Sequence, residues 1–169
     1  MALRIGIGHD THRLQPGGPL RMGGLDIPFD KQMVGHSDAD VLLHAVTDAI
    51  LGAAALGDIG ELFPNTDDAN KNRDSLEMLK LAAQEVAAAG YSIINIDCIV
   101  FAQLPKLSPH KKEIAQKIAA ALDLPPENVG VKAKTGESVG PVGRGESIDA
   151  QCVALLARTA ALDDDRSKT

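Results

Sequence analysis

The chain has 169 residues, of which 44% are hydrophobic and 24% are charged, a composition typical of one folded domain. Its formal net charge of −6 argues against a general nucleic-acid-binding protein, because phosphate backbones require a basic face. Aromatic residues are scarce, with no Trp, one Tyr and three Phe, so platforms for base stacking are not expected. Local positive charge can still serve a small phosphorylated ligand.

The composition favours one domain without targeting or membrane segments. We expect residues 1–160 to form a single domain and residues 161–169 a charged C-terminal tail. The N-terminus lacks the pattern of a signal peptide and no segment approaches the length of a membrane span, so a cytoplasmic protein is expected. Cys98 and Cys152 each lie in an apolar alternating run. We interpret both as buried thiols, with a disulfide as the less favoured alternative.

The first predicted element is a strand at residues 3–8, where apolar and small residues alternate. Residues 14–24 are rich in Gly and Pro and predict turns and a small hairpin. A short edge strand is expected at residues 25–29, which contain a proline that cannot donate a ladder hydrogen bond. A helix follows at residues 41–51, with Ser37 predicted to begin its capping box.

The rest of the chain continues this alternation of strands and helices. Its predicted elements are, in order, a loop at residues 57–73, a helix at 75–89, a strand at 91–101, a helix at 109–122 capped by Ser108, a strand at 129–133, a Gly-rich loop at 135–145 and a strand at 147–157. This order predicts an α+β fold, in which a mixed β-sheet carries its helices on one face.

Histidines and carboxylates cluster near the start of the chain. Asp10 and His12 alternate on a strand and therefore share one face. His44 lies on a polar stripe of the predicted helix with Asp40 and Asp48, either of which would suit an outer carboxylate of a metal site. One carboxylate and two imidazoles suit zinc better than magnesium and leave a position open for substrate. We therefore interpret Asp10, His12 and His44 as ligands of a catalytic metal.

Three further segments each allow two interpretations. The segment with His36 and Ser37 can simply cap the helix through Ser37, and His36 can in addition donate to an anionic group at the helix N-terminus; the two interpretations are compatible. Asp58, in a Gly-flanked loop, is either a turn residue or an acceptor for sugar hydroxyls. Residues 132–137 place lysines, a hydroxyl and Glu137 at a strand end, where phosphates and a hard divalent cation can bind. The glycine and lysine spacing is not that of a P-loop.

Together, these motifs resemble those of the 2-C-methyl-D-erythritol 2,4-cyclodiphosphate synthase family of the non-mevalonate isoprenoid pathway. The resemblance runs from about residue 4 to residue 158 and rests on residues 8–12, 35–40 with His44, 57–60, 63–67, 102–107, 131–135 with Glu137, and 143–146. It implies a phosphorus–oxygen lyase that converts 4-diphosphocytidyl-2-C-methyl-D-erythritol 2-phosphate to the 2,4-cyclodiphosphate and CMP. In this reaction the 2-phosphate attacks the β-phosphate, and no protein nucleophile is needed.

The resemblance also implies roles for individual residues. The three metal ligands would hold one Zn²⁺ per subunit, and Glu137 would help hold Mg²⁺ or Mn²⁺ at the diphosphate. His36 and Thr135 match positions that stabilise the transition state. Residues 58 and 60 match contacts to the erythritol, and residues 102–107 and 133–135 match the cytidine pocket. The implied substrate-binding residues are Ser37, Asp58, Ile59, Gly60, Phe63, Asp67, Ala102, Lys106, Leu107, Ala133, Lys134, Gly136 and Arg144.

The resemblance further implies a homotrimer around a threefold axis, with active sites between subunits. Its partner would be a small-molecule cytidine diphosphate ester, and neither nucleic acid nor a membrane. The chain departs from the family pattern at Asn65, where aspartate is frequent, and at Lys134, where a hydroxyl residue is common. Pro141 and Val142 occupy a stretch that in some members lines the central cavity with an aromatic residue. None of these departures involves the metal ligands.

Two alternatives remain open beside the cyclase. The first is a zinc-dependent phosphoester hydrolase, in which a zinc-bound water attacks the substrate. The second is a non-catalytic trimeric module that binds a nucleotide or an isoprenoid diphosphate. A linear product would favour the hydrolase, and any turnover would exclude the module.

Overall fold

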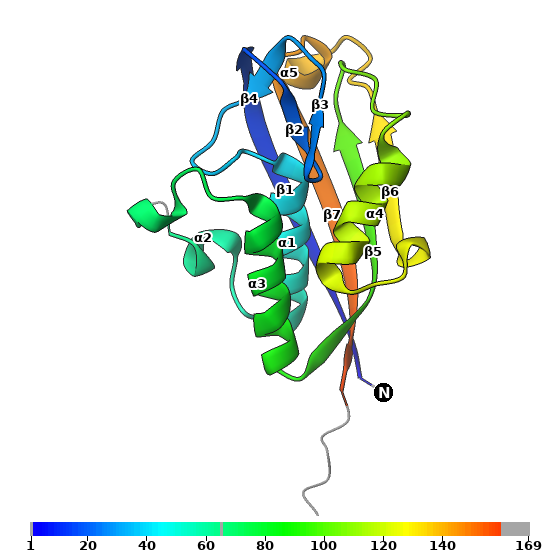
Figure 1. The fold of residues 1–169 in the computed structure, drawn as a ribbon. Coiled ribbons are helices and arrows are strands. Elements are labelled where there is room, and N and C mark those ends of the chain that lie inside the picture. The colour runs from blue at the N-terminus through cyan, green and yellow to red at the C-terminus, as the bar shows by residue number, and fades with distance from the viewer. Residues whose placement is uncertain (1, 65, 160–169) are drawn as a thin grey trace, which may run out of the picture.

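A computed structural model describes residues 2–64 and 66–159, and these residues form a five-stranded sheet with its long helices on one face (Figure 1). The sheet order is β4-β1-β7-β5-β6. Its strands are β1 (Leu3–Pro16), β4 (Lys31–Met33), β5 (Tyr91–Phe101), β6 (Val129–Lys134) and β7 (Ser147–Arg158). Only β5 and β6 pair in parallel, so the sheet is mixed and the predicted α+β class is confirmed.

The remaining elements cover this sheet or connect its strands. The long helices are α1 (Val41–Ala54), α3 (Ser75–Ala88) and α4 (Lys111–Leu122). The short ones are α2 (Ile59–Leu62), α5 (Gly140–Gly143) and the 3-10 turns η1 (Asp68–Asn70) and η2 (Pro126–Asn128). A small hairpin joins β2 (Leu20–Met22) to β3 (Leu25–Ile27), so the segment predicted as a separate edge strand supplies the second strand of the hairpin. No helix among the described residues has both the length and the apolar character needed to cross a membrane.

Two glycines let α1 lie directly on β1. A Cβ atom on Gly6 would stand 2.1 Å from the carbonyl oxygen of Ala49, and one on Gly8 would stand 1.9 Å from that of Ala45. Real Cβ atoms do not approach so closely, so a side chain at either position would push the helix away. The strand continues past these glycines with Asp10 and His12 on the same face. The backbone contact therefore sets the distance between these side chains and the helix that carries His44.

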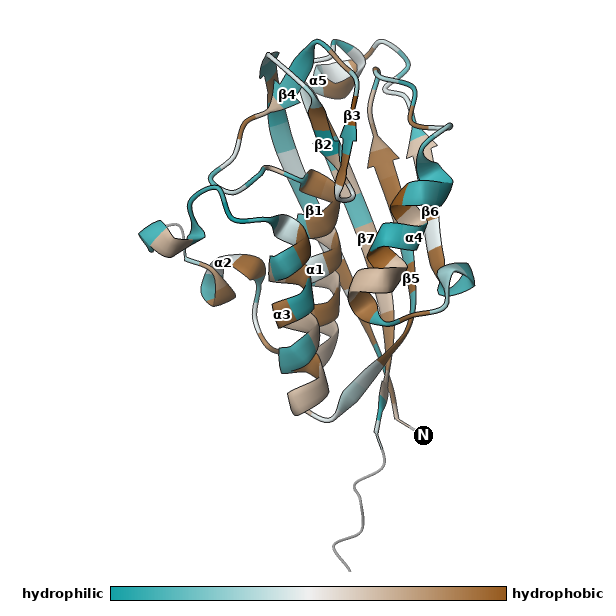
Figure 2. Cartoon of the chain, viewed as in Figure 1, coloured by the Kyte–Doolittle hydropathy of each residue, from teal (hydrophilic) through white to brown (hydrophobic). Residues whose placement is uncertain are grey.

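The core lies between the sheet and the helices. Almost every side chain of α1 is buried, and Figure 2 shows this helix mostly in brown, whereas α3 and α4 carry teal bands. Cys98 and Cys152 face each other across β5 and β7 as buried free thiols, which confirms their interpretation. The outer face of the sheet is not covered in the single chain: Ile5 and Ile7 are 74% and 71% exposed.

Two predicted helix caps are wrong. Asp40, and not Ser37, is the N-cap of α1, because its carboxylate accepts the N–H of Leu43 at 3.1 Å. The helix ends at Ala54, before Gly57, the residue expected to terminate it. The third helix begins at Lys111 after a turn in which the His110 N–H donates to the carbonyl of Leu107. Ser108 therefore does not cap it.

Other boundaries differ in ways that affect the site. Strand β1 runs through the histidine motif to Pro16 instead of ending before it, so Asp10 and His12 sit on regular strand backbone. The expected loops at residues 57–73 and 135–145 contain α2, η1 and α5. The predicted tail at residues 161–169 lies outside the described residues, as does Asn65.

Candidate metal centre

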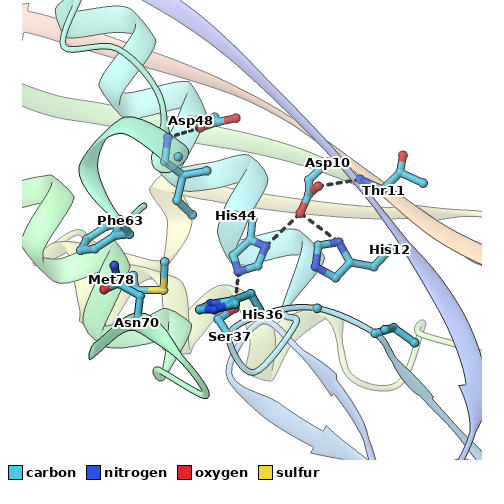
Figure 3. A pocket seen from close by; sticks show the side chains of 14 residues that line it. Asp10, Thr11, His12, His36, Ser37, His44, Asp48, Phe63, Asn70 and Met78 are labelled. Atoms are coloured by element: carbon cyan, nitrogen blue, oxygen red, sulfur yellow. Dashed lines mark hydrogen bonds and ion pairs between the residues drawn. The ribbon is translucent and has the colours of Figure 1, made fainter. Parts of the chain in front are cut away.

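Asp10, His12 and His44 converge at the side of α1 that faces β1 (Figure 3). One potential ligand atom from each lies within 4.8 Å of the others. The Nδ1 atom of His44 is 2.9 Å from Oδ2 of Asp10, and Nδ1 of His12 is 3.2 Å from the same oxygen. Among the described residues this is the only group of three or more potential ligands that meets such a distance limit. The predicted ligand set is therefore brought together by the fold.

The electrostatics of this cluster favour an ionised carboxylate. Burial opposes the charge on Asp10, but hydrogen bonds and charge interactions with His12 and His44 outweigh burial and lower its pKa well below the usual range. For His12, burial acts to lower the pKa, and the contact with Asp10 more than compensates and raises it. The negatively charged carboxylate of Asp10 thus lies between the imidazoles of His12 and His44, an arrangement that attracts a cation.

A divalent metal ion fits these residues. Although His12 Nδ1 is near Asp10, it is the one buried side-chain polar atom of the described residues without a hydrogen-bond partner of acceptable geometry. A buried polar atom without a partner is costly, and an ion bound between the three side chains would satisfy it. The donor set of one carboxylate oxygen and two imidazole nitrogens matches what zinc prefers.

The far side of the His44 ring meets two hydroxyl groups. Its Nε2 atom lies 3.0 Å from Oγ of Ser37 and 3.0 Å from Oγ of Ser75. The carboxylates of its own helix do not make this contact: Asp40 accepts the Gly24 and Leu43 N–H groups instead. The polar stripe on α1 therefore does not supply the outer carboxylate that the sequence predicted.

The cluster opens into a cavity of about 330 Å³ (Figure 3). Of the predicted site residues, His36, Ser37, Ile59, Gly60 and Phe63 line it together with the three ligands. Its remaining walls include side chains that the prediction did not assign to the substrate, namely Asp48, Asn70 and Met78. The cavity is therefore continuous from the metal ligands to α2.

Two carboxylates shape the part of the cavity next to α2. Asp48 accepts the N–H of Ile59 at 2.8 Å, and burial raises the pKa of Asp48. Asp58 caps α2 by accepting the N–H of Glu61 at 2.9 Å. Asp67 similarly caps η1, by accepting the N–H of Ala69. Asp58 and Asp67 thus have structural contacts in the single chain, and both lie beside segments that line or border the cavity.

A second group of predicted residues gathers at the ends of β5 and β6. These strands are parallel, so their carboxyl ends lie together, and the Ala102 N–H donates to the carbonyl of Lys134 at 2.9 Å. Beyond this point, Thr135 donates to the carboxylate of Glu137. The predicted members of this group are Ala102, Lys106, Leu107, Ala133, Lys134, Thr135, Gly136 and Glu137. None of them lines the cavity at the metal ligands within one chain.

Arg144 lies just beyond α5 and forms an ion pair with Glu146, with 2.8 Å between Nε and Oε1. Both side chains are exposed. Nearby, Gly136 and Val142 border a smaller cavity of about 240 Å³ with His9, Phe101, Asp149 and Gln151. By strand alternation His9 points to the sheet face opposite Asp10, so this cavity and the metal cluster lie on different faces.

The sequence of the chain matches a known family over nearly its whole length. A model of the YgbB family matches residues 3–157. The chain belongs to the YgbB family. Within it, the chain is 55% identical over 161 residues to the 2-C-methyl-D-erythritol 2,4-cyclodiphosphate synthase of Burkholderia mallei strain SAVP1, covering 95% of this chain and 99% of that protein. The predicted family resemblance is confirmed, and with it the class of enzyme, a lyase.

Solved structures agree with this assignment. A 2C-methyl-D-erythritol-2,4-cyclodiphosphate synthase in a CDP-bound form superposes with a TM-score of 0.84 at 38% identity, covering 91% of this chain and all of that one. The bifunctional IspDF from Campylobacter jejuni gives a TM-score of 0.90 at 43% identity over 93% of this chain. The chain spans 42% of the length of that bifunctional protein.

Sequence reasoning missed the residues behind His44. Asp38 belongs to a motif that the sequence singled out, but only its neighbours His36 and Ser37 were assigned roles. Ser75 is the first residue of α3 and lies 31 positions from His44, so no spacing rule connects the two. Only the packing of α3 beside α1 reveals the contact.

Proposed function

We propose that this protein converts 4-diphosphocytidyl-2-C-methyl-D-erythritol 2-phosphate to 2-C-methyl-D-erythritol 2,4-cyclodiphosphate and CMP, in the non-mevalonate route to isoprenoid precursors. The convergence of Asp10, His12 and His44 at the wall of one cavity supports the proposal most directly. The 55% identity to a named synthase over 161 residues, 95% of the chain, supports the choice of substrate.

The reaction needs positioning and charge neutralisation more than a protein nucleophile. An oxygen of the 2-phosphate forms a bond to the β-phosphorus, and the bond from this phosphorus to CMP breaks. When bound, Zn²⁺ at Asp10, His12 and His44, with Mg²⁺ or Mn²⁺ at Glu137, would supply positive charge to the diphosphate. His36 and Ser37 line the same cavity and would orient the reacting phosphates. Thr135 holds the Glu137 carboxylate through a hydrogen bond and would stabilise the transition state.

The erythritol part of the substrate is proposed to bind along α2. Ile59 and Gly60 already line the cavity, and the hydrogen bond from the Ile59 N–H to Asp48 fixes the start of this helix. Asp58 stands beside them and would accept sugar hydroxyls. Phe63 closes the cavity and is held under the guanidinium of Arg73, 5.1 Å from its ring centroid. Asp67 follows at η1.

The cytidine is proposed to bind at the ends of β5 and β6. Residues 102–107 and 133–136 offer backbone groups there, and the exposed side chains of Lys106, Lys134 and Arg144 add positive charge. Because this group lies apart from the metal cavity within one chain, a complete site requires a second subunit. We propose a cytoplasmic homotrimer around a threefold axis, in which each site combines the metal ligands of one subunit with the cytidine pocket of the next.

Metal removal tests the proposed chemistry. Chelator-treated protein should release no CMP from the substrate, and addition of Zn²⁺ with Mg²⁺ should restore release. Zn²⁺ alone should bind but restore little activity, because the ion at Glu137 would be missing. Full turnover in protein shown by elemental analysis to hold no metal would contradict the proposal.

A further inference from the structure

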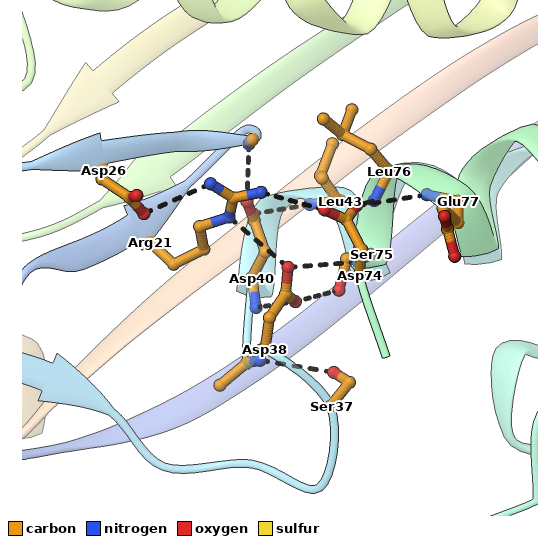
Figure 4. Close-up of polar contacts among 12 residues, drawn as sticks. Arg21, Asp26, Ser37, Asp38, Asp40, Leu43, Asp74, Ser75, Leu76 and Glu77 are labelled. Carbon is orange, nitrogen blue, oxygen red and sulfur yellow. Dashed lines mark hydrogen bonds and ion pairs between the residues drawn. The ribbon is translucent and has the colours of Figure 1, made fainter. Parts of the chain in front are cut away.

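A chain of hydrogen bonds connects His44 to Asp38, a partly buried carboxylate that does not line the metal cavity. Figure 4 shows the part of this chain between Asp38 and Ser75. The Oγ atom of Ser75 lies 3.0 Å from Nε2 of His44. The same hydroxyl donates to Oδ1 of Asp38, and the backbone N–H of Ser75 donates to Oδ2 of Asp38 at 3.1 Å. The order of contacts is therefore Asp38, Ser75, His44, and the far side of the His44 ring faces Asp10.

The chemistry of these groups fixes the direction of each proton. An ionised carboxylate can only accept hydrogen bonds, and a serine hydroxyl has one proton to donate. Since the proton of Ser75 is committed to Asp38, its oxygen can only accept from His44 Nε2. The imidazole must then carry a proton on Nε2, so in the neutral ring that binds a metal the lone pair lies on Nδ1. This is the nitrogen that faces Asp10 at 2.9 Å.

Asp38 is itself held in place as a charged acceptor. Its Oδ2 atom lies 3.4 Å from Nε of Arg21, and the side chains of both residues are largely covered. Arg21 also contacts Asp26 and Asp74 at 3.2 Å each, so three carboxylates share one guanidinium (Figure 4). The N–H of Asp40 gives Asp38 a further donor at 3.3 Å. Every contact named here presents a donor to Asp38, so this carboxylate acts only as an acceptor.

We propose that Asp38 and Ser75 are positioning residues that hold His44 in the tautomer with its proton on Nε2, so that Nδ1 is free to bind the metal. The inference rests on the metal site of the proposed function but not on the reaction performed there. In the opposite tautomer, the proton on Nδ1 would point at Asp10 and block that nitrogen as a ligand. Outer partners of this kind orient histidine ligands and raise metal affinity.

Ser37 provides a matched comparison at the same ring nitrogen. Its hydroxyl lies at the same 3.0 Å from Nε2, but its contacts do not commit its proton: its Oγ accepts from the N–H of Ala39. Ser37 can therefore donate to Nε2 or accept from it, and it favours neither tautomer. Removing the Ser75 and Ser37 hydroxyls one at a time therefore tests whether the direction of the hydrogen bond at Nε2 matters, or only the presence of a polar group.

The first experiment measures Zn²⁺ affinity by competition with a chromophoric chelator. Ser75→Ala should weaken binding about 10- to 100-fold, in the range found for outer partners of metal ligands. Ser37→Ala should weaken it clearly less. Asp38→Ala should also weaken Zn²⁺ binding, because Ser75 would then be free to donate to Nε2. As a control, Asp26→Ala removes another partner of Arg21 and should leave Zn²⁺ affinity unchanged. Equal effects of Ser75→Ala and Ser37→Ala, or unchanged affinity in Ser75→Ala, would overturn the inference.

The second experiment needs no variant of this network. Nitrogen-15 NMR of the zinc-loaded wild-type protein, with His44 assigned by its loss in His44→Ala, reports which ring nitrogen carries the proton. A protonated Nε2 and a metal-bound Nδ1 are expected, and the reverse pattern would refute the inference even if the Ser75 and Asp38 variants failed to fold. Both readouts are independent of product formation. A protein that failed to cyclise the substrate would therefore not affect this conclusion.

Discussion

His44 receives contacts from both sides of its ring, and its position depends on three separate segments. Strand β1 supplies Asp10 at Nδ1, while the loop before α1 and the start of α3 supply Ser37 and Ser75 at Nε2. A side chain held this firmly loses little further freedom when it binds an ion. The candidate metal site is thus preorganised, as expected of sites that act by positioning.

Replacement of His44 tests its role as a ligand. His44→Ala should remove stoichiometric zinc and lower CMP release by more than about 100-fold, because the charge placed at the diphosphate is lost. The protein should stay folded and trimeric, as judged by circular dichroism and light scattering. As a control, His36→Ala should lose rate and keep its zinc, since His36 lines the cavity outside the ligand set. An active, zinc-free His44→Ala protein would exclude His44 as a ligand.

Glu137 tests the second ion independently of the first. Glu137→Gln should leave zinc content unchanged and raise the Mg²⁺ concentration needed for half-maximal CMP release about tenfold or more, because an amide oxygen binds hard cations less well than a carboxylate. A titration of activity with Mg²⁺ at saturating Zn²⁺ measures this. If the Mg²⁺ dependence were unchanged, Glu137 would not hold that ion.

The packing of α1 on β1 connects fold stability with the site. Gly8→Ala would place a Cβ atom against the carbonyl of Ala45, and we expect it to lower the free energy of unfolding by about 1–3 kcal/mol, as overpacking does. It should also weaken zinc binding, because α1 carries His44. Urea denaturation and chelator competition measure the two effects.

Gly52 on the same helix is the control for this substitution. A Cβ atom there meets nothing within 4 Å, so Gly52→Ala should stabilise the protein by up to about 1 kcal/mol through helix propensity. Similar losses of stability for Gly8→Ala and Gly52→Ala would contradict the claim that close backbone contact matters at β1.

The sequence predicted most elements, because hydrophobic periodicity and Gly or Pro breaks mark them clearly. Strand β5 has its predicted limits, and α3 ends within one residue of its expected end. The cap of α1 was harder to predict than its first residue, since the residues before this helix offer several capping side chains. Ser37 has the right type for a cap, but the fold uses it beside His44 and gives the cap to Asp40.

The cluster of candidate metal ligands was predictable because their residue types are unusual in such positions and Asp10 and His12 alternate on one strand. The Ser75 contact was not predictable, since it depends on how α3 packs beside α1. The residues proposed to bind cytidine are inferred only from the family resemblance. Their motifs lie at strand ends and loops, where sequence patterns alone do not reveal which other residues complete a site.

At the scale of the whole molecule, the uncovered outer face of the sheet supports the proposed trimer. Leu3, Ile5 and Ile7 are all more than half exposed in the single chain, and Val153 is 46% exposed. Exposed apolar surface on this scale marks an interface more often than a solvent-facing surface. Because side chains alternate along β1, Asp10 and His12 lie on the sheet face that carries the helices, and Leu3, Ile5 and Ile7 lie on the opposite face.

A charge on this face should disrupt assembly. Ile5→Glu should shift the protein from trimer towards monomer in size-exclusion chromatography with light scattering, and CMP release should fall with it, because each site would lose its second half. Leu81→Glu, at a partly exposed apolar position on α3, should leave the trimer intact. A fully active monomer would contradict the shared site.

Phosphorus NMR of the reaction tests the central claim most directly. The purified, zinc-loaded protein is incubated with 4-diphosphocytidyl-2-C-methyl-D-erythritol 2-phosphate and Mg²⁺, and the products are followed by their ³¹P signals. The account predicts CMP together with a cyclic diphosphate whose two phosphorus atoms are coupled. CMP with a linear phosphate product would instead identify a hydrolase. An unchanged substrate in the presence of zinc-loaded trimer would show that the site does not perform this reaction.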